Sequence, residues 1–216
     1  MNDITGFNPS ELKSQIATFV EKGKAIYDAL SKADWDFYDV LYRSWFSPKA
    51  KDFEPHLYDL GRVVYNLYIA YEKTASAMVE AYNAHAAANG TAAMANEYEG
   101  AEYQPDGANF GDKHLEEASP DGVVGMKTKV VIPATIALGK TIRSQLERVK
   151  ESYDLPAFYD PEGNQIEAYV GTVNKMSEKI ESELNNIASA IAGAIEQEEE
   201  IVERSAAQAA ETLSEQ

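Results

Sequence analysis

Few residues of this chain have the types and spacing that chemistry needs. The chain contains three histidines, His56, His85 and His114, and no cysteine. Without cysteine it can form no disulfide, thiolate metal site or cysteine nucleophile. No Glu-x-x-His pair of the di-metal kind is present, nor a glycine-rich phosphate loop or a Gly-x-Ser-x-Gly elbow. We therefore expect no catalytic residues, no cofactor and no enzymatic activity.

One acidic stretch has the alternation of a metal loop. Asp160, Glu162 and Asn164 are spaced like the first ligands of a calcium-binding loop. The stretch lacks the glycine at the sixth place and the bidentate acid at the twelfth. We therefore expect Asp160 to cap a helix, and we expect no metal-binding residues anywhere in the chain.

The charge of the chain limits its partners. It has 216 residues, of which 44% are hydrophobic, and a formal net charge of −17. This charge repels phosphate backbones and anionic lipid, so we expect neither nucleic-acid binding nor membrane insertion. A basic protein partner remains open, and so does solubility alone as the reason for the charge.

The beginning of the chain carries no visible targeting segment. No basic stretch followed by an apolar run occurs there, and no run of 18 apolar residues exists that could span a bilayer. We expect a protein that is cytoplasmic before any export and that, if secreted, uses no cleavable signal peptide.

Apolar spacing predicts an all-α fold of four helices in two hairpins. Steps of three and four residues predict a first helix that starts at Asn8-Pro9 and stops before Pro48. A second runs from Phe53 to the stop signal Asn89-Gly90. Periodicity is lost over residues 90–127, which hold many acids, glycines and two prolines.

The second half repeats the helical pattern. A third helix places Ile132 and Ile136 on its apolar face, and a fourth carries a coiled-coil seam at intervals of seven from Ile166 to Ile201. The domains predicted are a first hairpin (1–89), an acidic linker (90–127) and a second hairpin with an acidic C-terminal helix (128–216). Together the hairpins would close into one four-helix bundle.

The two halves align with each other. At an offset of 116 residues, Gly23 and Lys24 match Gly139 and Lys140, and at an offset of 113 Trp45 matches Phe158. Any two heptad-bearing hairpins slide into apolar register, which is the competing explanation. The matches outside the heptads, including an aromatic-x-x-Pro turn in both halves, favour an internal duplication.

The first turn resembles a known family. It contains Trp45, Ser47 and Pro48, followed by Ala50 and Phe53. A tryptophan and a small residue two places later, between two antiparallel helices, resembles the WXG family of type VII secretion substrates. Its pattern is Trp-x-Gly, followed by an alanine and then an aromatic residue. A large aromatic residue that closes the end of a hairpin is the competing explanation for the tryptophan.

The resemblance implies a fold and a function. Family members are single hairpins that pair as four-helix dimers, so a tandem chain would contain the whole dimer. The chain departs from the pattern at Ser47, where glycine is usual, and in the second turn, where Phe158 and Pro161 follow the aromatic-x-x-Pro form without a tryptophan. The family often carries a Tyr-x-x-x-Asp/Glu export signal after the second helix, and Tyr98 and Glu102 have that form.

Tyrosines on the second helix suggest a partner face. Tyr58 and Tyr65 lie one residue past the apolar seam, where they would either meet a partner or wedge the bundle against the linker. The leading hypothesis is a tandem WXG-like substrate or partner of type VII secretion. The alternative is a structural or assembly protein of a phage virion or another particle.

Overall fold

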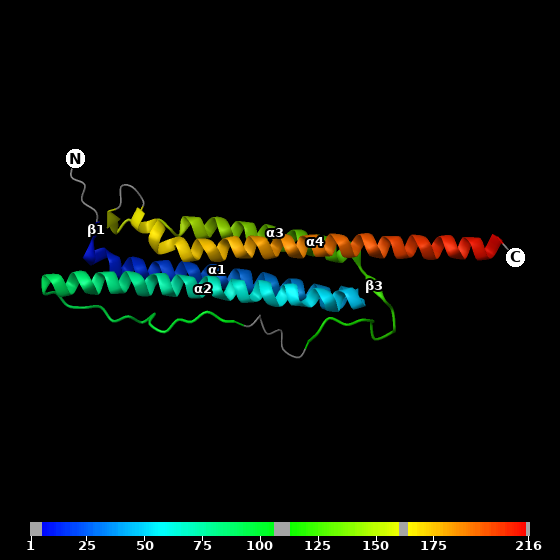
Figure 1. Ribbon diagram of the computed structural model, residues 1–216, viewed down its shortest axis with the longest axis horizontal. Coiled ribbons are helices and arrows are strands. Elements are labelled where there is room, and N and C mark those ends of the chain that lie inside the picture. Colours follow the sequence, from blue (N-terminus) through cyan, green and yellow to red (C-terminus); the bar gives the residue numbers. More distant parts are fainter. Residues whose placement is uncertain (1–5, 106–112, 160–163, 215–216) are drawn as a thin grey trace.

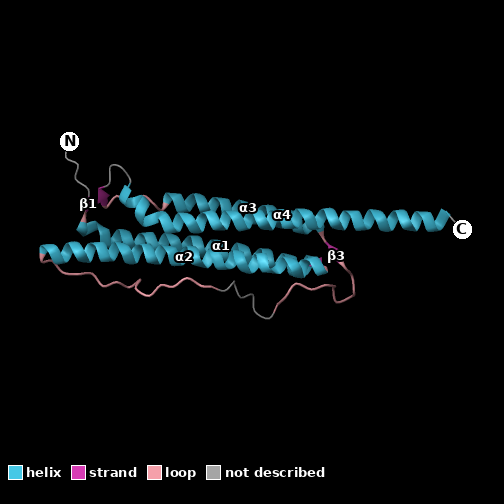
Figure 2. Ribbon diagram, viewed as in Figure 1, coloured by secondary structure: helices cyan, strands magenta, loops and turns pink. Residues whose placement is uncertain are grey.

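Helices make up most of the protein, and the prediction of an all-α fold is confirmed (Figure 2). The computed structural model describes residues 6–105, 113–159 and 164–214. The described helices are α1 (Pro9–Ser44), α2 (Pro48–Asn89), α3 (Thr128–Glu151) and α4 (Asn164–Ser214). They lie along one long axis as an elongated helical bundle (Figure 1).

Local capping explains where the first two helices begin and end. Asn8 accepts a hydrogen bond from the N–H two residues on (3.1 Å), and Pro9 occupies the first turn of α1, as predicted. Ser47 caps α2 in the same manner, so α2 begins at Pro48, earlier than the predicted Phe53. Gly90 ends α2 with a φ of 64°, a left-handed conformation that glycine adopts without strain.

Each helix packs against two neighbours. The first hairpin consists of α1 and α2, and the second of α3 and α4; α1 also packs on α3, and α2 on α4. Neighbouring helices run antiparallel (Figure 1). The contact between α3 and α4 is the least extensive of the four. The second hairpin is therefore held mainly through its contacts with the first.

Two short strand pairs tie each hairpin to the turn of the other. β1 (Gly6–Phe7), just before α1, pairs with β4 (Phe158–Tyr159) in the second turn. β3 (Gly125–Met126), just before α3, pairs with β2 (Trp45–Phe46) in the first turn. Both pairs are antiparallel. This reciprocal pairing is what a duplicated hairpin predicts.

The predicted seam of α4 is confirmed for most of its length. Val173, Ile180 and Ile187 are fully buried, and Ala194 is nearly so. The next residue of the series, Ile201, is 58% exposed. Figure 1 shows why, because the C-terminal part of α4 continues past the ends of the other helices.

The predicted face of α3 is wrong in its first turns. Ile132 and Ile136 are 41% and 53% exposed, whereas Val131 and Leu138 are buried. α3 contains two overlapping apolar stripes, and the one that faces α1 enters the core. Periodicity alone does not say which of two stripes a neighbouring helix covers.

The segment between α2 and β3 folds back along the first hairpin (Figure 1). We call residues 91–124 the strap; its described parts are 91–105 and 113–124. Hydrogen bonds join it to α1, to α2 and to the first turn. No helix of the described ranges is long and apolar enough to cross a membrane.

Candidate functional site at the first hairpin turn

Trp45 lies at the centre of the first turn. It is 1% exposed, and its ring centroid is 5.2 Å from that of Phe53 at the start of α2. The strand pair β2–β3 fixes its backbone. Ser47 is buried too, and its side chain caps α2 while its N–H donates to the Glu116 carbonyl in the strap (3.1 Å). A serine thus supplies a cap that glycine, the usual family residue, would lack.

Trp45 forms one wall of a pocket between the two hairpins. The pocket has a volume of about 310 Å³ and is lined by Trp45, Lys49, Asp52, Phe53 and His56 and by four residues of α4: Ala190, Gly193, Ala194 and Gln197. The Nε1–H of Trp45 is buried, and within the described ranges no acceptor faces it. A buried donor without an acceptor lowers the stability of a fold by about 1–3 kcal/mol. The indole ring of Trp45 is therefore held in place by packing, because its N–H finds no acceptor among the described residues.

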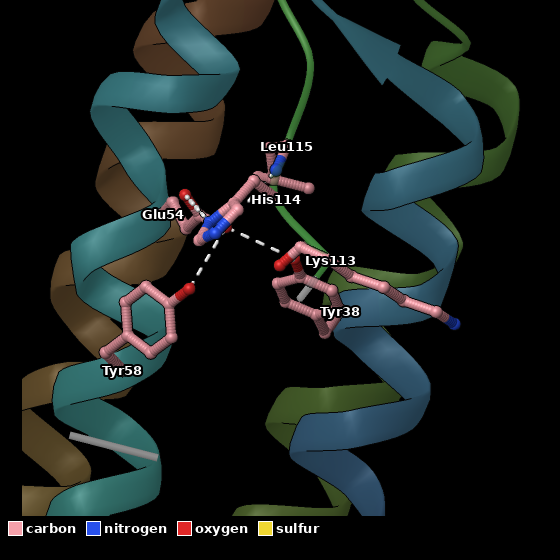
Figure 3. Close-up of polar contacts among 6 residues, drawn as sticks. All are labelled: Tyr38, Glu54, Tyr58, Lys113, His114 and Leu115. Carbon is pink, nitrogen blue, oxygen red and sulfur yellow. Dashed lines mark hydrogen bonds and ion pairs between the residues drawn. The ribbon is translucent and has the colours of Figure 1, made fainter. Parts of the chain in front are cut away.

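Glu54, the residue after Phe53, is the centre of a buried polar cluster (Figure 3). Its side chain is almost fully buried on α2. Its Oε1 lies 3.2 Å from the Tyr38 hydroxyl, 3.3 Å from the Tyr58 hydroxyl and 3.2 Å from the Leu115 N–H. The ring of His114 approaches it as well, with Nδ1 3.3 Å from Oε1. One carboxyl group thereby joins α1, α2 and the strap.

The hydroxyls around Glu54 are held in their protonated form. Burial, and then the nearby Glu54 carboxylate, raises the pKa of Tyr38 and of Tyr58 above the ordinary value for tyrosine. The Tyr38 hydroxyl is also 2.7 Å from the Lys113 carbonyl oxygen, to which it donates. The donors of this cluster are directed at acceptors of the same cluster. Such an arrangement fastens the strap, and it leaves the carboxyl group of Glu54 little room for a reactant.

Two asparagines of α2 hold the other half of the strap. The Asn83 amide donates to the Met94 carbonyl (2.8 Å) and accepts from the Met94 N–H (2.7 Å). The Asn66 amide does the same with Gln104, at 3.0 and 2.8 Å. Each amide therefore satisfies one backbone donor and one acceptor of the strap, as a neighbouring β-strand would.

The two tyrosines predicted as a partner face lie beneath or beside these contacts. Tyr58 is half-buried and points at Glu54. Tyr65 is half-buried as well, and its ring meets that of Tyr27 edge to face, with centroids 5.8 Å apart. Both thus contribute to packing between α1, α2 and the strap, and any contact with a partner stays a prediction.

The predicted export signal lies on the strap. Tyr98 is half-buried and packs against the hydrophobic core, whereas Glu102 is exposed. The segment forms a turn and is not part of a helix, because α2 ends at Asn89. Burial is the main cause that raises the pKa of Tyr98.

The second turn is simpler than the first. Phe158 is 6% exposed, and its ring lies between those of Phe7 and Tyr169, with centroids 6.1 and 5.3 Å away. Pro161 and the predicted cap Asp160 lie outside the described residues.

Sequence reasoning singled out Trp45, Ser47 and Phe53 at the first turn but missed the polar residues that hold the strap. The rings of Trp45 and Phe53 are in contact, and Ser47 caps α2. Glu54, Asn66 and Asn83 gave no expectation, because polar residues on a helix are usually solvated. One signal was available, since asparagine is a poor helix former, and Asn66 lies in the middle of α2 and Asn83 near its C-terminal end.

Among the described residues, no group of three or more His, Cys, Asp or Glu side chains is placed to hold a metal ion. The contacts that the site does show, around Trp45 and Glu54, join α1, α2 and the strap to one another. No family model, curated protein or solved structure matches the chain.

Proposed function

We propose that this chain is a non-enzymatic protein-interaction module, in which two hairpins close into a four-helix bundle that resembles a WXG-type pair fused into one chain. On this proposal it is a tandem substrate of type VII secretion, or a helical partner for secreted cargo. It would be cytoplasmic before export and would leave without a cleavable signal peptide.

The reciprocal strand pairing carries the proposal. Each turn is paired with the strand that precedes the other hairpin, so each hairpin completes the end of the other. A dimer of single hairpins would place the same elements opposite one another across a two-fold axis. The resemblance at Trp45 and Ser47 adds the family motif at one of these two junctions.

Buried polar contacts between the hairpins support a closed pair. The hydroxyl oxygens of Tyr71 and Ser152 are 2.8 Å apart. Ser152 already donates to the Val149 carbonyl (2.6 Å), so Tyr71 is the donor in this pair. Thr74 donates to the Tyr169 carbonyl on α4 (3.0 Å). These bonds sit in an interface that is otherwise apolar, and they fix the register of α2 against the second hairpin.

Secretion is the first test of the proposal. We expect the protein in the culture medium of its source organism, and we expect deletion of the type VII machinery to remove it from the medium but not from the cells. Equal export in both strains, or none in either, would contradict the proposal.

The Tyr98–Glu102 pair offers a sharper test. Glu102 is exposed, and among the described residues it forms no hydrogen bond or ion pair with the bundle, so Glu102→Gln should block export without lowering the free energy of unfolding. Glu99→Gln, on an equally exposed neighbour, is the matched control and should leave export unchanged. Export that survives Glu102→Gln would remove this pair as a signal.

A second candidate function has an observation of its own. Exposed aliphatic residues along α3 favour a structural or assembly protein of a virion or another particle, because apolar surface of this kind marks contact sites. A fixed stoichiometry with a particle component, and no export, would favour this alternative.

A further inference from the structure

The outer face of α3 combines aliphatic and basic side chains. Ile132 and Ile136 are 41% and 53% exposed. Lys129, Lys140 and Arg143 follow the same face, since the steps from 129 to 143 are three or four residues. All three cations are exposed, and in the described part of the chain no ion pair involves them. Within the described ranges, no other helix buries this face.

The part of α4 beyond Gln197, which still lines the pocket at the first turn, has the opposite character. We call residues 198–214 the overhang, and Figure 1 shows the end of α4 running past the rest of the bundle. Ile201 continues the buried seam of α4 but is 58% exposed. Glu198 and Glu200 precede it, and residues 198–204 contain four glutamates and one arginine. The seam thus extends beyond the helices that cover it elsewhere.

The two surfaces complement each other in charge and in length. Helix α3 carries five lysines and arginines against two glutamates, in a chain whose net charge is −17. At a rise of 1.5 Å per residue, α3 is roughly 36 Å long and the overhang roughly 26 Å. Opposite charges around an apolar stripe bring two helices together and fix their register.

The overhang of one chain is out of reach of its own α3. It belongs to a single continuous helix, α4, which runs from Asn164 to Ser214 and points away from the bundle. α3 lies back along the bundle (Figure 1). A contact between these surfaces must therefore be made between two molecules.

We propose that the α4 overhang of one copy docks on the outer face of α3 of a second copy, so that chains associate head to tail. Each copy then keeps one free overhang and one free α3 face. Such a heterologous contact builds rings where the rotation closes and filaments where it does not. The proposal does not depend on the proposed function, because it concerns surfaces outside the core that joins the two hairpins.

The test is the mass of the purified full-length chain in solution, measured by sedimentation or light scattering over a range of concentrations. We expect association beyond the 23.8 kDa monomer at low salt, and weaker association at high salt because the contact is ionic. A chain that stays monomeric at every concentration at low salt overturns the proposal.

Charge reversal identifies the surfaces. Lys140→Glu with Arg143→Glu makes the α3 face acidic, and Glu198→Lys, Glu199→Lys and Glu200→Lys together make the overhang basic. Each of these two variants alone should associate about ten-fold more weakly or worse, since like charges then meet. A mixture of the two variants should associate as the unchanged chain does, because contacts between one variant and the other again join opposite charges. Failure of the mixture to recover overturns the proposal.

A matched control separates the site from the overall charge. Lys13→Glu with Lys22→Glu makes the same change of net charge as the α3 variant, at exposed positions of α1, and it should leave association unchanged. Circular dichroism checks that every variant keeps its helices. Vesicles with anionic lipid and a basic peptide are tested in parallel. Binding of either one by a chain that does not self-associate assigns the surfaces to that ligand and overturns the proposal.

Discussion

The first hairpin is covered along most of its length, whereas the second leaves one helix largely open. α1 and α2 bury large aromatic residues between them, Phe19, Tyr38, Trp45 and Tyr71 among the most enclosed. The strap adds Leu115 and a series of hydrogen bonds to that hairpin. On α3, by contrast, Val130, Ile132 and Ile136 are exposed.

The difference follows from the strap. Both hairpins contribute to the same core, but only the first receives the strap, which follows it in the chain. The second, whose first helix has 24 residues against 36 in α1, has no comparable cover among the described residues. We therefore expect the first hairpin to supply more of the stability than the second.

Replacing the aromatic residues of the two turns, Trp45 and Phe158, should give the largest difference in stability between the two hairpins. Trp45→Ala removes a fully buried ring that contacts α2 and the strand pair, and we expect a loss of about 3–5 kcal/mol in the free energy of unfolding. Phe158→Ala should cost less, because Phe158 is smaller and borders the open end of the second hairpin. Denaturant unfolding measures both.

Trp45→Phe is the control for this pair. It keeps an aromatic ring and removes the unsatisfied Nε1–H, so its loss should be well under half that of the alanine variant. A larger loss of stability for Phe158→Ala than for Trp45→Ala would contradict the expectation that the first turn is the more tightly packed of the two.

Alanine at the matched glycines Gly23 and Gly139 should change the free energy of unfolding in opposite directions in the two hairpins. A Cβ atom at Gly23 would overlap the ring of Tyr71, whereas one at Gly139 would meet only Leu184 Cδ1, at 3.9 Å. Gly23→Ala should therefore destabilise by about 1–3 kcal/mol through overpacking. Gly139→Ala should stabilise by about 0.5–1 kcal/mol, because alanine is the better helix former.

Thermal or denaturant unfolding of the two alanine variants tests this prediction. Equal effects at Gly23 and Gly139 would mean that the hairpins are packed alike. Gly23 faces Tyr71 and Gly139 faces Leu184, and these two partners are themselves matched at the offset of 113.

Sequence patterns predicted the elements of this fold better than their faces. The caps at Asn8 and Gly90 and the seam of α4 up to Ala194 were predicted, because they depend on local chemistry or on a long regular period. The exposed positions of Ile132 and Ile136 were not, because α3 has two apolar stripes and the choice depends on which helix lies beside it.

The candidate site was predicted only in part, because some of its residues belong to a local sequence motif and others meet only in the folded chain. Trp45 and Phe53 belong to a local turn motif, and local motifs are visible in a sequence. The strap is not local, because Glu54 and Leu115 are 61 residues apart in the chain. Its composition predicts only the loss of regular structure, and the asparagine amides that hold it resemble solvated side chains until the backbone lies beside them.

The smallest expected effect on the free energy of unfolding concerns the strap, the segment that covers the first hairpin and not the second. Asn83→Ala removes two hydrogen bonds to Met94, and Asn66→Ala removes two to Gln104. Each variant should lose about 0.5–1.5 kcal/mol, partly offset by the better helix propensity of alanine. Amide exchange at Met94 and Gln104 should quicken far more than exchange inside α1 and α2, because the strap opens without unfolding the hairpin.

Asn186→Ala on α4 is the matched control. That asparagine is exposed and, among the described residues, its side chain bonds only to Glu183 within its own helix (3.2 Å), so its loss should leave stability unchanged or slightly raised. If Asn66→Ala and Asn83→Ala behave like Asn186→Ala, the strap does not protect the first hairpin. The contrast between a sealed and an open hairpin would then come from core packing alone, with the aromatic residues of α1 and α2 as its cause.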